Sequence, residues 1–157
     1  MTTTRILDGE IIPARLDDIR VYEGVLARRM MAFVIDYLLV ALLTIPFAVL
    51  VFVLGIVTLG LGWALFSVLF PAVALTYVWN TMGGPGQATV GMRTMGIRLE
   101  RLDGRRIDGL LAVVHTVLFW AGNVVLTPLI LLATLFLERK RTVHDLLLGT
   151  VVARADR

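Results

Sequence analysis

The chain has 157 residues, a length that suits a single domain. Hydrophobic residues make up 58% of it and charged residues 17%, and its mean hydropathy of +0.86 is too high for an ordinary soluble domain and indicates a membrane protein. The absence of cysteine excludes disulfide frameworks, thiolate metal sites and a cysteine nucleophile, and the net charge of +3 comes mainly from arginines that flank apolar runs, which indicates membrane topology and not nucleic-acid binding.

The N-terminal segment is mixed and polar. Its first 29 residues contain five arginines and five acids, and they lack the apolar region and small-residue cleavage site of a signal peptide. We therefore expect residues 1–27 to form a cytoplasmic tail and residues 28–157 to form the membrane domain.

The first apolar run extends from Met30 to Thr81, and Asp36 is its only charged residue. Its length allows two spans of about 20 residues each. The glycine-rich stretch Gly55–Gly62 is the natural break, which places the spans at residues 31–54 and 61–81.

The polar, basic segment at residues 82–109 contains an Asp-Gly pair, Asp103-Gly104, after a short alternation of apolar side chains at Ile97 and Leu99. Asp-Gly between alternating segments is a strong hairpin signal. The sequence therefore predicts a short cytoplasmic β-hairpin, with a disordered basic loop as the alternative.

The third apolar run, residues 110–137, has 28 residues without an acid, lysine or arginine. As a helix it would be about 42 Å long, against a hydrocarbon core of about 30 Å. The positive-inside rule places the tail and the 82–109 loop in the cytoplasm and Gly55–Gly62 outside. One crossing would then put the basic cluster at 138–141 outside, against the positive-inside rule. Two crossings would have only 14 residues each, which is too short to span the bilayer. Two solutions stay open: an interfacial helix followed by one crossing, or a re-entrant hairpin.

These features predict an all-α integral membrane protein. We expect a small helical bundle of about three membrane segments with a short cytoplasmic β-hairpin, embedded in the lipid bilayer with its N-terminus in the cytoplasm. Because three helices enclose too little volume for a private pathway, a transport function would require a homo-oligomer.

Asp36 needs explanation because a charge at bilayer depth costs at least about 2.5 kcal/mol on insertion scales. Arg29 lies two helical turns before it on the same face, about 10 Å along the axis, which is too far for a direct pair. We expect Asp36, as the sole buried acid, to be neutralised by guanidinium groups at the inner leaflet. Its pairing is either structural or part of a transport step. The candidate partners of the two residues are Asp145, His115, Arg93 and the cluster Arg139–Arg141.

The segment Arg141–Val152 has two interpretations. A threonine before an apolar run, followed closely by His144 and Asp145, is typical of a helix N-terminus, where an acid meets the helix dipole. Alternatively, Asp145 reaches the region of Arg29 and Asp36, where His144 would titrate near neutral pH.

Three blocks of the chain form an ordered pattern. They are R-x-x-A-x-x-I-D at Arg29–Asp36, Q-x-T-x-G-x-x-x-x-G-I-R at Gln87–Arg98 and R-T-x-H-D-x-x-x-G-T-x-V at Arg141–Val152. With these blocks the chain resembles the RDD family of bacterial membrane proteins, named for one arginine and two aspartates, from about Tyr22 to Arg154. By position, the naming residues are Arg29, Asp36 and Asp145.

The resemblance implies a multi-pass protein of the bacterial cytoplasmic (inner) membrane. Transport is suspected in the family, and cation/proton antiport is proposed for some members. Members often have an arginine early in the third run, where this chain has His115, a weaker and pH-sensitive cation. The candidate charge network is Arg29, Asp36, Asp145, His144 and His115. The candidate motif loop contains Gln87, Thr89, Gly91, Arg93 and Gly96.

Enzymatic motifs are absent. The glycine-rich stretch Gly83–Gly91 has the spacing of neither phosphate-binding motif, and neither H-E-x-x-H nor G-x-S-x-G occurs. We expect no enzyme, cofactor, metal site or nucleic-acid partner. Two functions stay open: a homo-oligomeric transporter of small cations or solutes, coupled to protons through the charge network, or a non-transporting scaffold or assembly factor in which that network is structural.

Overall fold

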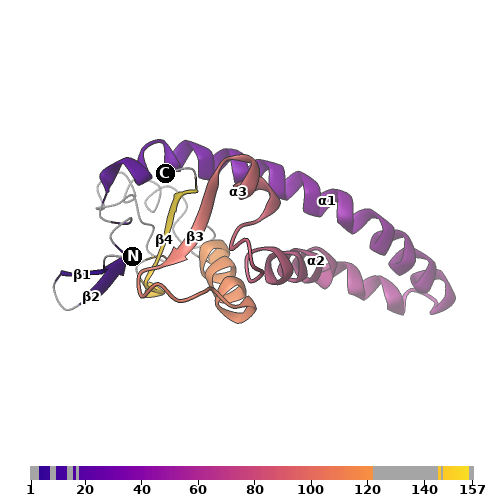
Figure 1. The fold of residues 1–157 in the computed structure, drawn as a ribbon. Coiled ribbons are helices and arrows are strands. Elements are labelled where there is room, and N and C mark those ends of the chain that lie inside the picture. The colour runs from indigo at the N-terminus through magenta and orange to yellow at the C-terminus, as the bar shows by residue number, and fades with distance from the viewer. Residues whose placement is uncertain are drawn as a thin grey trace.

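A computed structural model of the chain describes residues 4–7, 10–13, 16, 18–121, 145 and 147–155. Its dominant feature is a long helical hairpin (Figure 1). The hairpin consists of α1 (Val25–Val57), the 3-10 helix η3 (Leu61–Leu65) and α2 (Phe66–Thr81).

The two arms of this hairpin have the length and composition of membrane spans. Two helical stretches in the described part are long and apolar enough to cross a membrane, Arg20–Val57 and Leu61–Thr81. They coincide with the two expected spans, although α1 already begins at Val25. Only 17% and 22% of their most apolar windows are buried, whereas the core helix of a soluble protein is mostly buried. The apolar side chains of the hairpin therefore face outward.

The expected break at Gly55–Gly62 is a close helix-to-helix turn. A Cβ on Gly62 would lie 2.8 Å from the Gly55 backbone nitrogen, so the chain can cross here only without a side chain. The Trp63 indole stacks on Phe52 at 6.3 Å between ring centroids and donates a hydrogen bond to the Phe52 carbonyl at 3.3 Å. These contacts fix the tip of the hairpin.

The other end of the hairpin is attached to a small packed unit (Figure 1). It contains α3 (Val90–Thr94) and an antiparallel pair of strands, β3 (Ile97–Arg101) and β4 (Thr150–Arg154), in which Ile97 pairs with Arg154 and Arg101 with Thr150. A single apolar core joins α1, α2, α3, β3 and β4. Its members include Val25, Ala32, Val78, Met92, Leu99 and Val152.

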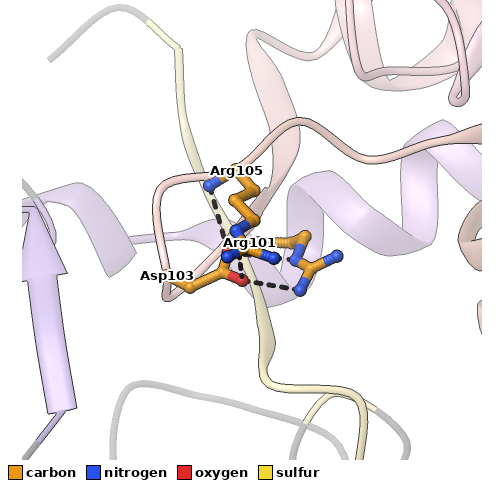
Figure 2. Close-up of polar contacts among 3 residues, drawn as sticks. All are labelled: Arg101, Asp103 and Arg105. Carbon is orange, nitrogen blue, oxygen red and sulfur yellow. Dashed lines mark hydrogen bonds and ion pairs between the residues drawn. The ribbon is translucent and has the colours of Figure 1, made fainter.

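The predicted hairpin at Asp103-Gly104 is wrong in its second strand, because β3 pairs with β4 from the C-terminal end. Figure 2 shows the turn that follows β3. The Asp103 carboxylate accepts hydrogen bonds from the Arg101 side chain at 2.6 and 3.0 Å and from the Arg105 backbone N–H at 3.0 Å, which ties the chain into a local turn. The residues after the turn include charged side chains, whereas the first three residues of β4 are uncharged and buried. Pairing of β3 with β4 therefore buries more apolar surface than pairing with the residues after the turn.

The N-terminal segment contains a pair of strands that the sequence did not predict. Strands β1 (Thr4–Leu7) and β2 (Glu10–Pro13) form an antiparallel pair, and the 3-10 helix η2 (Ile19–Tyr22) follows. Side chains around η2 form a second core with the turn after β3 and with β4. This core contains Leu16, Val21, Tyr22, Leu102, Val151 and Ala153.

The third apolar run begins with a helix over Gly109–Ala121. Its first residue lies against the end of α2, since a Cβ on Gly83 would be 2.5 Å from the Gly109 Cα. The remainder of the run, residues 122–137, lies outside the described residues. We call residues 25–81, from the start of α1 to the end of α2, the helical hairpin, and the described residues from Leu16 to Gly24, those in 82–112 and those from 145 onward the base.

Candidate functional site: a carboxylate, an ion pair and a cavity

The carboxylate of Asp36 accepts three hydrogen bonds, all from uncharged groups. Oδ1 accepts one from the Tyr77 hydroxyl at 2.6 Å and one from the Gly91 backbone N–H at 2.7 Å, and Oδ2 accepts one from the Thr89 hydroxyl at 2.5 Å. These donors belong to α2 and to the start of α3. One side chain of α1 therefore joins three helices.

The Tyr77 hydroxyl is the partner that sequence reasoning missed. It donates to Asp36 and also accepts from the Val90 backbone N–H at 2.9 Å, so it bridges the carboxylate and the first turn of α3. A tyrosine in an apolar run has an apolar body and one polar tip that needs a partner when buried. This requirement indicates that the Tyr77 hydroxyl has a polar partner, but it does not identify Asp36 as that partner.

The expectation that guanidinium groups neutralise Asp36 is wrong for the described part of the chain. No arginine there forms an ion pair with this carboxylate. The cluster Arg139–Arg141 lies outside the described residues. Asp36 is also not the buried acid of the described residues, because it is only half-buried whereas Asp145 is 0% exposed. Neutral donors replace a cation here because three hydrogen bonds already satisfy most of the carboxylate's acceptor capacity.

Arg29 pairs with Asp145, one of the candidate partners. The Arg29 Nη2 atom lies 2.8 Å from Asp145 Oδ2, and the side chains are 17% and 0% exposed. The His115 Nδ1 atom lies 3.7 Å from the other oxygen, Oδ1, and His115 is itself buried. The pair links the start of α1 to the C-terminal part of the chain, and the histidine brings in the helix over Gly109–Ala121. His144 lies outside the described residues.

The motif loop supplies two of the three hydrogen-bond donors to the Asp36 carboxylate. Thr89 is the N-cap of α3, and its hydroxyl accepts from the Met92 N–H while donating to Asp36. A Cβ on Gly91 would lie 2.2 Å from the Ala32 carbonyl oxygen and 2.8 Å from the Asp36 carboxyl carbon. Only glycine allows α3 to approach α1 closely enough for the Gly91 N–H to reach the carboxylate.

The other motif residues fix the backbone conformation of the loop that carries these donors. Gln87 has a φ of 47°, and its carbonyl accepts from the Leu99 N–H at 3.0 Å, which positions β3. The Arg93 side chain donates to the carbonyls of Ala88 at 3.1 Å and Thr81 at 3.5 Å, and so caps the end of α2. Gly96 has a φ of 66°, a backbone conformation that favours glycine, at the turn into β3.

A second contact that the sequence did not reveal holds α1 to the loop. The Arg28 Nη1 atom donates to the Met95 carbonyl at 2.5 Å. Consecutive arginines on α1 thus have separate roles, since Arg28 binds the loop and Arg29 binds Asp145. In the described part of the chain, no group of three or more His, Asp or Glu side chains has the arrangement of a metal site.

A cavity of about 500 Å³ lies between α1, α2 and the helix over Gly109–Ala121. Its polar lining consists of Arg29, Asp36, Tyr77, Thr89, His115 and Thr116, and the rest of its lining is apolar or aromatic. This volume is within the range of about 300–1,000 Å³ of pockets that bind small organic molecules. Asp36 and His115 therefore line the same cavity, whereas Asp145, the partner of Arg29, does not line it.

Comparisons with known proteins give one match. No curated protein and no solved structure matches the chain. The model of the RDD family matches residues 24–149, a range that includes α1, α2, the motif loop and Asp145. The match and the two apolar helices together indicate a membrane protein. The chain belongs to the RDD family.

Proposed function

We propose that the chain is a multi-pass protein of the bacterial cytoplasmic membrane, with the helical hairpin in the bilayer and the base in the cytoplasm. Exposed apolar side chains on the hairpin and exposed arginines at 93, 105 and 106 on the base support this orientation. The β3–β4 pair supports a cytoplasmic C-terminus, because a bilayer cannot separate two hydrogen-bonded strands. Residues 97–101 and 150–154 would then lie on the same side of the membrane.

We further propose that the protein transports a small cation or solute in exchange for protons. The observation that carries this proposal is a carboxylate, Asp36, at the wall of a 500 Å³ cavity between two apolar helices. Ionisable groups at such positions in membrane proteins commonly mark substrate or proton pathways. In this mechanism a cation and a proton compete for the same carboxylate, so binding of one releases the other. Because a bundle of about three membrane segments encloses too little volume for a private pathway, this function would require assembly as a homo-oligomer.

Flux in proteoliposomes tests the transport proposal. With an imposed proton gradient, wild-type protein should move cations and dissipate the gradient, and Asp36→Asn should abolish the proton-coupled part. Asp103→Asn, which removes a carboxylate on the surface of the base, is the matched control and should keep full flux. Equal proton-coupled flux in wild type and Asp36→Asn would remove Asp36 from the mechanism.

A second candidate function is a non-transporting scaffold or assembly factor. The favouring observation is that the hydrogen bonds of Asp36 join α1 to α2 and α3, and that the Arg29–Asp145 pair likewise joins distant segments. Under this alternative, Asp36→Asn lowers thermal stability, wild-type protein shows no flux, and crosslinking in cells captures a partner protein. Crosslinks only between copies of this chain would contradict it.

A further inference from the structure

Aromatic side chains dominate the wall of the cavity. Six of them line it: Phe33, Tyr37, Phe70, Tyr77, Phe119 and Trp120. Four form a connected series from one helix to the next, with ring centroids 5.8 Å apart for Phe33–Phe119, 6.2 Å for Phe33–Tyr37 and 5.5 Å for Tyr37–Phe70. Aromatic faces carry negative electrostatic potential and attract cations, most strongly where water is excluded.

The charges around the cavity favour a cation over an anion. Arg29 is the only described lysine or arginine in the lining, and its charge is balanced by Asp145 at 2.8 Å. Asp36 has no such partner among the described residues, since its three hydrogen bonds come from neutral groups. One negative group therefore remains at the base of an apolar space.

The lining does not suit a small inorganic cation. Such ions require several oxygen ligands to replace their hydration shell, about six to eight for calcium and six for magnesium. The two hydroxyls that contact the Asp36 carboxylate, those of Tyr77 and Thr89, already donate to it and accept from the Val90 and Met92 N–H groups. A weakly hydrated organic cation needs no such shell, because aromatic and apolar contacts replace its solvent.

We propose that the cavity is a binding site for an organic cation with apolar substituents, whose charged centre lies near Asp36 and whose substituents contact the aromatic wall. This assignment gives the substrate class of the transport function proposed above. Only the biological role of the bound cation, as a transported substrate, rests on that proposed function. Binding itself requires only the cavity, the carboxylate and the rings.

Two probes of the same shape and opposite charge test the proposal. Tetraphenylphosphonium and tetraphenylborate are added separately to full-length detergent-purified protein, and bound probe is measured by equilibrium dialysis against protein-free micelles. We expect saturable binding of the cation and no saturable binding of the anion. Asp36→Asn should remove the preference for the cation. Saturable binding of both probes in wild-type protein, or of neither, would overturn the proposal.

Phe70→Leu provides a test that leaves the hydrogen bonds of Asp36 intact. Loss of one cation–π contact should weaken tetraphenylphosphonium binding about threefold to thirtyfold. Phe47→Leu is the matched control, because Phe47 lies on α1, is 51% exposed and does not line the cavity. An equal affinity in wild type, Phe70→Leu and Phe47→Leu would place the probe elsewhere and contradict the assignment.

The same probes separate this proposal from the transport proposal. Specific binding of tetraphenylphosphonium without any flux in proteoliposomes would retain the site and reject transport. Proton-coupled flux of sodium or potassium ions without binding of tetraphenylphosphonium would retain transport and reject the organic-cation site.

Discussion

The base and the helical hairpin are stabilised in different ways. In the base, apolar side chains such as Ile97, Leu99 and Leu102 are at most 2% exposed and form a core of the kind found in soluble domains. In the hairpin, Leu50 is 66% exposed and Leu59 at the tip is 97% exposed. The base can therefore gain stability from the hydrophobic effect in water, whereas the hairpin can bury its surface only in lipid or against other chains.

The polar contacts lie at the junction between these two regions. Arg28, Arg29 and Asp36 all belong to the part of α1 nearest the base, and each contacts a segment distant in sequence. The apolar core already joins both helices to the base, and these directional contacts add a defined orientation. The motif residues Arg29, Asp36 and Gly91 make their contacts at this junction.

The largest expected effect is the loss of the buried ion pair. Asp145→Asn leaves the Arg29 charge without its partner in a site where Asp145 is fully buried, and should destabilise the protein by about 3–5 kcal/mol. The control is Glu100→Gln, whose partner Arg98 is 41% exposed, with an expected cost below about 1 kcal/mol. Thermal unfolding of both variants in detergent measures the difference. Equal melting temperatures would show that the junction does not depend on the pair.

The same substitution in the two regions tests their different stabilisation. Leu99→Ala in the base should cost about 2–5 kcal/mol, because Leu99 is 0% exposed and its removal leaves a cavity. Leu50→Ala in the hairpin should change stability in detergent by less than about 0.5 kcal/mol, because that side chain already faces outward. Denaturant titration of both variants gives the two free energies. Similar losses would mean that the hairpin has a packed core of its own.

A smaller effect is expected for the tyrosine that seats Asp36. Tyr77→Phe removes a hydrogen bond to the carboxylate and the acceptor of the Val90 N–H, and should cost about 1–3 kcal/mol. Tyr37→Phe is the matched control, since Tyr37 also lines the cavity but its hydroxyl makes no hydrogen bond within the described residues. A melting temperature lowered only for Tyr77→Phe would show that the Tyr77 hydroxyl stabilises the contact with Asp36. Equal shifts for both variants would contradict this.

The smallest effect is a pH dependence at the turn after β3. Burial by itself would raise the pKa of Asp103, but the hydrogen bond from the Arg105 N–H and the Arg101 and Arg105 guanidinium groups together outweigh it, so that the pKa lies below its ordinary value (Figure 2). Asp103 therefore contributes stability above a pH of about 4, and loses it as the pH falls through its folded-state pKa. Because the side chain is 42% exposed, this contribution is below about 0.5 kcal/mol. Asp103→Asn should flatten the acid limb of the stability curve, and an unchanged limb would assign that limb to other carboxylates.

The sequence predicted what depends on local composition. The spans were identifiable because Met30–Thr81 carries a single charge, and the break at Gly55–Gly62 was identifiable from its glycines. Asp145 was among the candidate partners of Arg29 because the pattern limited the choice to a few charged residues. Such features require only a count of residue types along the chain.

Long-range pairing was not predictable from the same rules. Tyr77 and Asp36 are 41 residues apart, and nothing in either segment specifies the other. β4 has no period-two alternation, since four of its five residues are buried, so it gave no strand signal. In the N-terminal segment, the sequence Asp8-Gly9 stands between β1 and β2 and is the same hairpin signal that was applied only to Asp103-Gly104.

The measurement that tests the account most directly is the sidedness of single cysteines, for which the cysteine-free chain is well suited. Leu59→Cys at the tip and Ala155→Cys after β4 both replace exposed residues. In intact cells, a membrane-impermeant thiol reagent should label Leu59→Cys at once and Ala155→Cys only after permeabilisation. Labelling of Ala155→Cys in intact cells, or protection of Leu59→Cys from the outside, would contradict a lipid-embedded hairpin on a cytoplasmic base.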